Sequence, residues 1–370
     1  MGKWTSVDKS DFWRVKELND VEVMNENEEI IGESKFVCTA NHGFAPYAQE
    51  ELRRRFGSLK SRVLMSGEVF LLTLQVEPER ALEMIVNHPP IFLRHIQPVD
   101  WEVNIDNIEE GFKELSSILL KEQNLQGAQV SLQVRKSDDS LWEESAGSLR
   151  EVIQSHLTEL QADFVLQDAE WCISIFAAGN ILYAGISKPQ NNLSDWSGGA
   201  VRFQREDGQI SRAKFKLLEA ERSFGIDFQS FRKALDIGAA PGGWTSFLLE
   251  RGLQVTAVDP ALMHESLVSN PALKILRKNA SEVKFRDHEF DLLVCDMSWS
   301  PKQMVRLVTE LLPALRTGGT AIITVKLMHK KPMALINDVI SSFEHVDMQV
   351  QSAKQLFHNR DEITLYMIKY

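Results

Sequence analysis

A glycine-rich run in the C-terminal half has the composition of a ligand-binding turn. The run is Asp236-Ile237-Gly238-Ala239-Ala240-Pro241-Gly242-Gly243-Trp244, with a strand expected before it and a helix after it. Small residues there let the backbone approach a ligand closely. The next strand ends at Asp259, where an acid conventionally binds the hydroxyls of a ribose. Because the run does not fit G-x-G-x-x-G, the spacing favours a nucleoside without a pyrophosphate over a dinucleotide, with a plain tight turn as the alternative.

Four charged residues lie near the strand ends at which an open α/β sheet usually carries its catalytic groups. Asp296 ends one expected strand, Lys326 ends the next, and Glu362 begins the last. Lys216 lies in a helix just before the glycine-rich strand. Each residue alone also fits an ordinary solvated position or a helix cap. Because ligands bind at the carboxyl ends of such strands, we expect the four to converge beside the nucleoside site.

Short apolar strands alternate with helices over residues 211–370 and predict one α/β domain. Strands separated by helices form a mostly parallel sheet that is covered on both faces. No helix separates the last two strands, so at least one of them runs antiparallel to the rest. The expected strands are 234–237, 255–259, 273–276, 292–296, 320–326, 347–352 and 363–368, and the expected helices 244–249, 301–315 and 333–343.

The front half predicts two smaller α+β domains. Residues 36–104 follow the order β-α-β-β-α-β, which is typical of ferredoxin-like folds. Residues 105–187 add two helices, a strand and a hairpin turned at Gly179-Asn180. We predict that residues 1–35 form an acidic flexible extension and that the polar, glycine-rich residues 188–210 form a linker.

The charge is divided unevenly between the two halves. The chain has a net charge of -11, made up of -14 in residues 1–210 and +3 in residues 211–370. A polyanion should therefore prefer the C-terminal half. In the acidic half, the run Arg53-Arg54-Arg55 with Lys60 fits either a phosphate contact or a solvated helix face. In the linker, Trp196 and Phe203 are candidates to stack on an unpaired base.

The spacing of the cysteines and histidines indicates the cellular compartment of the protein and whether its sequence has a metal-binding pattern. The three cysteines are far apart, which excludes a disulfide framework and a cysteine zinc site and favours the reducing cytoplasm. The nine histidines show no H-E-x-x-H pattern, so we expect no metal. A polar start and the lack of any run of about 20 apolar residues predict neither a signal peptide nor a membrane helix.

Residues 211–370 resemble the FtsJ-like ribose 2′-O-methyltransferases. The matching motifs are Ser211-Arg212-Ala213-Lys214-Phe215-Lys216-Leu217, Asp236 to Trp244, Asp296-Met297, Lys326 and Arg360-Asp361-Glu362. The resemblance implies S-adenosyl-L-methionine as the cofactor and a Lys-Asp-Lys-Glu tetrad of Lys216, Asp296, Lys326 and Glu362. It implies a cofactor site of Ser211, Asp236, Gly238, Ala240, Pro241, Gly242, Gly243, Trp244, Asp259, Asn279 and Asp296. Asn279 stands where the family has an acid near the adenine, and its carbonyl can still accept the amino hydrogen.

The front half resembles ferredoxin-like and THUMP-type RNA-binding domains. The expected fold is thus a Rossmann-like methyltransferase domain, with a mostly parallel sheet and an antiparallel terminal hairpin, preceded by ferredoxin-like and THUMP-like α+β domains. The implied activity is methyl transfer to a ribose 2′-hydroxyl. The implied partner is RNA, namely large-subunit (23S) ribosomal RNA, with no DNA and no membrane. We expect the protein to be monomeric and cytoplasmic.

Within this hypothesis, Lys326 is the base and the other three tetrad residues orient the ribose. A lysine acts as a base only where burial or a nearby cation such as Lys216 depresses its pKa. A catalytically silent RNA-binding adaptor is one alternative, which an intact tetrad argues against. A methyltransferase for another RNA, such as tRNA, is a second. Enzymes that methylate tRNA guanine at nitrogen carry Asp/Asn-Pro-Pro-aromatic, which the run Asp296-Met297-Ser298-Trp299 does not match.

Overall fold

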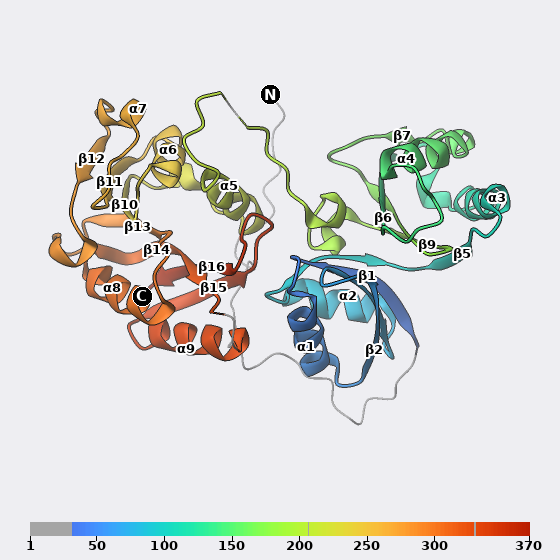
Figure 1. Ribbon diagram of the computed structural model, residues 1–370, viewed down its shortest axis with the longest axis horizontal. Coiled ribbons are helices and arrows are strands. Elements are labelled where there is room, and N and C mark those ends of the chain that lie inside the picture. The colour runs from blue at the N-terminus through green and yellow to red at the C-terminus, as the bar shows by residue number, and fades with distance from the viewer. Residues whose placement is uncertain (1–31, 206, 329–330) are drawn as a thin grey trace. The chain divides into compact units, whose positions relative to one another are not determined.

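The computed structural model describes residues 32–205, 207–328 and 331–370 (Figure 1). The described chain divides after residue 201 into two compact units, and each is treated by itself. Most of the predicted N-terminal extension, residues 1–31, lies outside the described residues.

The C-terminal unit contains a seven-stranded sheet in the order β12-β11-β10-β13-β14-β16-β15. The strands β10 to β14 are parallel, whereas β16 runs antiparallel to both β14 and β15. This confirms the expected α/β fold, a mostly parallel sheet with an antiparallel terminal hairpin. Its strands are β10 (Lys233–Ile237), β11 (Gln254–Val258), β12 (Leu273–Leu276), β13 (Phe290–Cys295), β14 (Leu315–Lys326), β15 (Met348–Lys354) and β16 (Glu362–Lys369).

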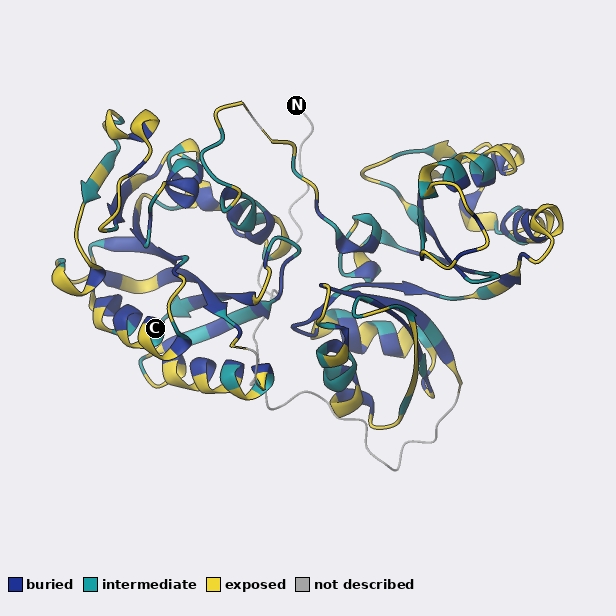
Figure 2. Cartoon of the chain, viewed as in Figure 1, coloured by how far each residue is buried: buried dark blue, intermediate teal, exposed yellow. Residues whose placement is uncertain are grey.

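Helices cover both faces of this sheet. In Figure 1, α5 (Lys214–Ser223) and α6 (Gly243–Glu250) lie on one face, and α8 (Pro301–Leu311) and α9 (Pro332–Glu344) lie on the other. The short α7 (Glu265–Val268) precedes β12. Apolar residues at helical spacing turn inward, so the strands are buried and the outer helix faces are exposed (Figure 2).

One helix ends earlier than its apolar pattern predicts. We expected a helix over 301–315, but α8 ends at Leu311 and a 3₁₀ turn follows over Leu312–Ala314. Pro313 lies in that turn, and a proline cannot supply the backbone N–H that a continuing helix requires. The chain therefore enters β14 directly at Leu315.

The N-terminal unit begins with a four-stranded antiparallel sheet in the order β2-β3-β1-β4. Two helices join these strands, and the element order along the chain is β-α-β-β-α-β. The elements are β1 (Ser34–Ala40), α1 (Ala45–Phe56), β2 (Leu59–Met65), β3 (Val69–Leu74), α2 (Pro78–Asn87) and β4 (Leu93–Pro98).

A second sheet of the same unit has five strands in the order β5-β9-β8-β6-β7. The two sheets share an apolar cluster that includes Val37, Leu71, Phe176 and Tyr183, so they pack as one body. The short strands β5 and β7 were not expected from the sequence. The elements are β5 (Trp101–Asn104), α3 (Ile108–Leu119), β6 (Gln129–Lys136), α4 (Ala146–Ser155), β7 (Asp163–Phe164), β8 (Trp171–Ala178) and β9 (Ile181–Ser187).

Part of the segment expected to be a linker packs on this unit. Residues 189–192 and 197–199 form 3₁₀ turns, and Asn192 is fully buried. The Arg94 guanidinium donates to the carbonyl of Gly198 at 2.8 Å, and the Gln133 amide donates to the carbonyl of Asp195 at 2.8 Å. These bonds fix the segment against β4 and β6.

Candidate catalytic and cofactor site

Four charged side chains meet at the carboxyl edge of the C-terminal sheet. The Lys216 Nζ lies 2.9 Å from both carboxylate oxygens of Asp296 and 2.5 Å from Oε1 of Glu362. The Lys326 Nζ contacts Oε2 of the same Glu362 carboxylate. The structure thus brings together all four residues that the sequence pattern singled out.

Strand register explains this convergence. Asp296 follows directly after β13, and Lys326 is the last residue of the neighbouring parallel strand β14. The antiparallel pairing of β14 with β16 sets Lys326 opposite Glu362, the first residue of β16. The Thr324 hydroxyl donates to Oδ1 of Asp296 at 2.8 Å, which fixes that carboxylate toward the same edge.

The network is electrostatically matched, with two cations and two anions. Burial lowers the pKa of Lys216, but the carboxylates of Asp296 and Glu362 outweigh burial and leave that pKa raised. Burial raises the pKa of Glu362, but Lys216 and Lys326 outweigh it and leave that pKa lowered. Both groups are therefore held in their charged forms.

Exposure distinguishes the two lysines. The Lys326 side chain is 29% exposed, whereas the Lys216 side chain is 14% exposed and the Glu362 side chain 3%. An incoming molecule can therefore reach Lys326 more readily than the other two.

Glu219 is a buried partner of this site that the sequence analysis did not find. It lies on α5, one turn after Lys216, and is 3% exposed. Its carboxylate accepts hydrogen bonds from the backbone N–H groups of Phe357, at 2.7 Å, and His358, at 2.9 Å. The helix that carries Lys216 is thereby tied to the turn that leads into Glu362.

Asn359 supports Glu362 directly. Its Nδ2 donates to Oε1 of Glu362 at 3.3 Å, and its Oδ1 accepts from the Leu356 backbone N–H at 2.9 Å and the Thr364 hydroxyl at 3.0 Å. The side chain is 2% exposed. From the sequence alone, Asn359 could have been noticed only as a polar residue next to the Arg360-Asp361-Glu362 motif. Glu219 gave no such indication, because a glutamate one helical turn from a lysine ordinarily lies on the surface.

The glycine-rich turn passes from β10 into α6 with its backbone close to neighbouring side chains. Gly238 and Gly242 have φ values of +74° and +118°, which favour glycine. A Cβ added at Gly238 would lie 2.4 Å from Cγ of Met297, and one added at Gly243 would lie 2.9 Å from Cβ of Ser211. Ser211 thus lies beside the turn. A backbone this bare, with Ala240 and Pro241 between the glycines, fits the close approach of a nucleoside.

Asp259 joins this turn to the end of β11. Its Oδ2 accepts from the backbone N–H of Ala240 at 3.1 Å, and its Oδ1 accepts from that of Ala261 at 2.8 Å. A carboxylate oxygen has two lone pairs, so Asp259 keeps capacity to accept from ribose hydroxyls. Asn279 lies after the next strand, β12, where its Nδ2 donates to the Glu282 carboxylate at 2.7 Å.

Two residues predicted for the cofactor site have buried side chains. Asp236 is 1% exposed and accepts from the Thr245 hydroxyl at 2.6 Å, and burial raises its pKa to about 7. Trp244 is 3% exposed and its indole N–H donates to the carbonyl of Ala213 at 2.8 Å. Their side chains therefore support the turn from beneath rather than line an open surface.

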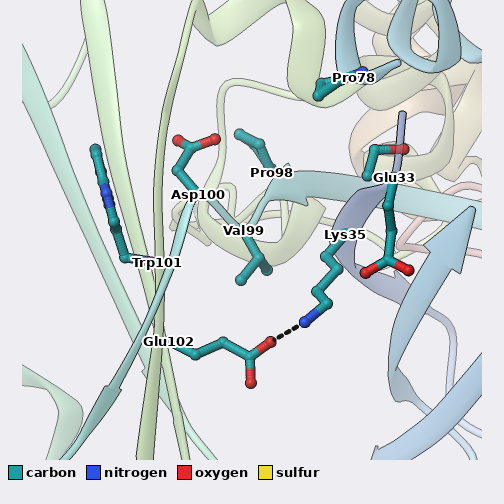
Figure 3. Close-up of a pocket in the computed structure, with 9 residues that line it drawn as sticks. Glu33, Lys35, Pro78, Pro98, Val99, Asp100, Trp101 and Glu102 are labelled. Atoms are coloured by element: carbon teal, nitrogen blue, oxygen red, sulfur yellow. Dashed lines mark hydrogen bonds and ion pairs between the residues drawn. The ribbon is translucent and has the colours of Figure 1, made fainter. Parts of the chain in front are cut away.

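The N-terminal unit has a pocket of about 570 Å³ between the start of β1, the start of α2 and the turn from β4 into β5 (Figure 3). Three carboxylates line it, from Glu33, Asp100 and Glu102, and its one lysine, Lys35, is paired with Glu102 at 2.7 Å. This excess of negative charge makes the pocket unsuited to a phosphate backbone.

Within the described ranges, no helix is long and apolar enough to cross a membrane. The same ranges contain no group of three or more His, Cys, Asp or Glu side chains that could hold a metal ion.

Comparison with known proteins supports the resemblance stated from the sequence. Residues 209–359 match the family of FtsJ-like methyltransferases. Three curated relatives carry the name "Ribosomal RNA large subunit methyltransferase M". That of Laribacter hongkongensis is 33% identical over 55% of this chain and 60% of its own length.

The other two relatives match to a similar extent. The protein of Halorhodospira halophila is 32% identical over 52% of this chain and 56% of its own length. The protein of Psychromonas ingrahamii is 34% identical over 50% of this chain and 53% of its own length. The chain thus spans between half and two thirds of the length of these curated relatives.

Proposed function

We propose that this protein transfers a methyl group from S-adenosylmethionine to a ribose 2′-hydroxyl of large-subunit (23S) ribosomal RNA. The observation that carries the proposal is the four-residue ion network of Lys216, Asp296, Lys326 and Glu362, placed at the same sheet edge as the glycine-rich turn. The match of residues 209–359 to FtsJ-like methyltransferases supports the same chemistry.

The cofactor would bind along the ends of β10, β11 and β12. The turn of Gly238, Ala240, Pro241, Gly242 and Gly243 would approach it through the backbone, with Ser211 alongside. Asp259 would accept from its ribose hydroxyls, Asn279 would face the adenine, and Asp236 and Trp244 would hold the turn in shape. When bound, S-adenosylmethionine supplies an electrophilic methyl group.

Lys326 would serve as the base. A ribose hydroxyl is a poor nucleophile until its proton is removed or polarised, and the Nζ of Lys326, once it has released its own proton, would accept that proton. Lys216 suits this role less, because it pairs with two carboxylates, Asp296 and Glu362, whereas Lys326 pairs with Glu362 and is more exposed. The two carboxylates would fix both lysines and orient the acceptor ribose.

We assign the front of the chain to substrate positioning. The strand order β2-β3-β1-β4, joined by two helices, supports a ferredoxin-like domain over residues 36–104. The five-stranded second sheet supports a THUMP-like RNA-binding domain over residues 105–187, with 188–210 leading to the catalytic domain, 211–370. The names of the curated relatives support ribosomal RNA of the large subunit as the substrate.

Two alternatives remain distinct outcomes of experiment. The intact tetrad, joined in one network of ion pairs, argues against a catalytically silent RNA adaptor. A tRNA methyltransferase is favoured less, since Asp296-Met297-Ser298-Trp299 lacks the Pro-Pro pair of the guanine-modifying enzymes. Because one chain supplies the whole tetrad, we also propose that the protein acts as a monomer, and ribosomal RNA as the substrate favours a cytoplasmic location.

Mapping of ribose methylation tests the proposal. Ribosomal RNA and tRNA from cells with and without the protein would be compared nucleotide by nucleotide. We expect one 2′-O-methyl group of 23S rRNA to disappear without the protein and to return when purified protein and S-adenosylmethionine are added. Loss of a tRNA methylation instead would favour the second alternative, and no change in either RNA would favour the silent adaptor.

A further inference from the structure

Four exposed arginines of the C-terminal unit lie close to the tetrad in the chain. They are Arg202, Arg205, Arg212 and Arg360, and we call them the arginine surface. Within the part of the chain that the structure describes, none of the four side chains forms a hydrogen bond or an ion pair. Their guanidinium groups therefore present unused donors.

A stack of three aromatic rings holds this surface together. The ring of Phe203 lies on that of His358, with centroids 5.5 Å apart and planes at 24°. Phe215 completes the group, 5.6 Å from Phe203 and 5.1 Å from His358. Phe203 is thus in contact with rings of its own unit, which favours a structural role for it over stacking on an RNA base.

The stack sets the positions of the arginines. Arg202 precedes Phe203, and Arg205 is two residues after it. Arg212 forms the turn before Phe215, whose backbone N–H donates to its carbonyl at 3.1 Å. The three chain segments that meet at the stack thus each carry at least one of these arginines.

The same stack borders the catalytic residues. Phe215 directly precedes Lys216 on α5, and His358 and Arg360 lie in the turn that leads into Glu362. The backbone N–H of His358 is held by Glu219, so this turn has a fixed position relative to α5. The arginine surface therefore adjoins the place where an acceptor ribose would meet Lys326.

We propose that the arginine surface binds the phosphodiesters next to the acceptor nucleotide, an inference that rests on the proposed function. A ribose at Lys326 brings its flanking phosphates with it, and arginine matches phosphate oxygens through paired N–H donors. Their acidic neighbours in the sequence are Glu206, Asp207 and Asp361, three acids against four arginines, so the group keeps a net positive charge.

The basic run of the front half does not compete for this role. Arg53 and Arg54 both pair with Glu50, at 3.0 and 3.1 Å, and Arg55 is buried with its guanidinium on the carbonyl of Met84. Their guanidinium groups are thus already engaged within the N-terminal unit. Of the two interpretations left open from the sequence, this favours a structural helix face over a phosphate contact.

Binding of the full-length protein to in vitro transcribed 23S rRNA, measured over a series of KCl concentrations, tests the proposal. We expect R202Q and R360Q each to weaken binding and the double variant to weaken it further. Each lost phosphate contact should reduce the slope of log K against log salt by about 0.7–0.9. R316Q is the matched control, because Arg316 is exposed near the start of β14, at the opposite end of that strand from Lys326.

The outcomes separate this inference from the proposed function. An unchanged salt slope in the double variant, in protein that methylates RNA and has the wild-type unfolding midpoint, would overturn the arginine surface and leave the activity standing. An equal loss in R316Q would also overturn it, because the effect would then be one of overall charge. If the wild-type protein methylates no RNA, the proposed function fails, whatever the arginines contribute to affinity.

Discussion

The Lys216 ammonium lies 2.9 Å from each carboxylate oxygen of Asp296, although the two residues are 80 positions apart in the chain. Lys216 comes from a helix that precedes the first strand of the sheet, and Asp296 from the end of the fourth strand in chain order. This pair, extended by Glu362, raises the pKa of Lys216 against the effect of burial and so favours its ammonium form. Lys326, the more exposed of the two lysines, is the one that we propose as the base.

Replacement of Lys326 tests that division of roles. We expect K326A to lower the rate of methyl transfer to 23S rRNA by at least about 100-fold, the usual contribution of a general base. Its affinity for S-adenosylmethionine should stay near the wild-type value, because the lysine would face the acceptor. Single-turnover transfer of labelled methyl and calorimetric titration measure the two quantities. K302A, an exposed lysine change on α8, is the control, and near wild-type turnover in K326A would contradict the mechanism.

Glu219 should act as a positioning residue. E219A would leave two partly buried backbone N–H groups without their acceptor, each at a cost of at most about 1–3 kcal/mol in the free energy of unfolding. E219Q keeps the shape and one carbonyl oxygen, so it should lose less stability and regain part of the activity. Urea unfolding, kcat and the KM for RNA would be measured for both variants.

The expected signature for Glu219 is a lower kcat with an unchanged affinity for S-adenosylmethionine. The control is E221Q on the same helix, whose carboxylate pairs with Arg251 rather than with the turn before Glu362. If E219A lost stability but kept the wild-type kcat, Glu219 would be structural only.

The sequence predicted the strand ends of the C-terminal unit well. Short apolar runs that stop at Asp296 or Lys326 are local signals, and the expected antiparallel hairpin placed Glu362 beside them. Partners such as Glu219 and Asn359 escaped prediction, because their bonds join segments far apart in the chain. The packing of residues 189–199 on β4 and β6 was not predicted either, because those hydrogen bonds also join segments far apart in the chain. A polar, glycine-rich segment has no periodicity that would show what it packs against.

Burial of Asp236 predicts a pH-dependent stability. Burial raises its pKa to about 7 in the folded protein, against about 3.9 when unfolded. Below pH 4 the carboxyl is neutral in both the folded and the unfolded chain, so it adds no pH dependence to the free energy of unfolding. Between pH 4 and 7 the unfolded chain ionises first, so the free energy of unfolding should fall by up to about 1.4 kcal/mol per pH unit from this group.

D236N removes this titration while it keeps an oxygen for the Thr245 hydroxyl. The stability of D236N relative to the wild type should therefore rise between pH 4 and 7 and level off above that range. Urea unfolding at several pH values measures the difference, with D287N, an exposed carboxylate, as the control. A difference that does not change with pH would show that Asp236 is already ionised in the folded protein.

The last prediction separates chemistry from RNA positioning. The C-terminal unit has its own sheet and its own apolar core, so a fragment of residues 202–370 should fold and bind S-adenosylmethionine as the full chain does. It retains Phe203 and the arginine surface but lacks the N-terminal unit. Because correct placement of an acceptor contributes strongly to rate, we expect its kcat/KM on 23S rRNA to fall at least about tenfold. A fragment that methylates the same nucleotide as efficiently as the full chain would show that the N-terminal unit does not position the RNA.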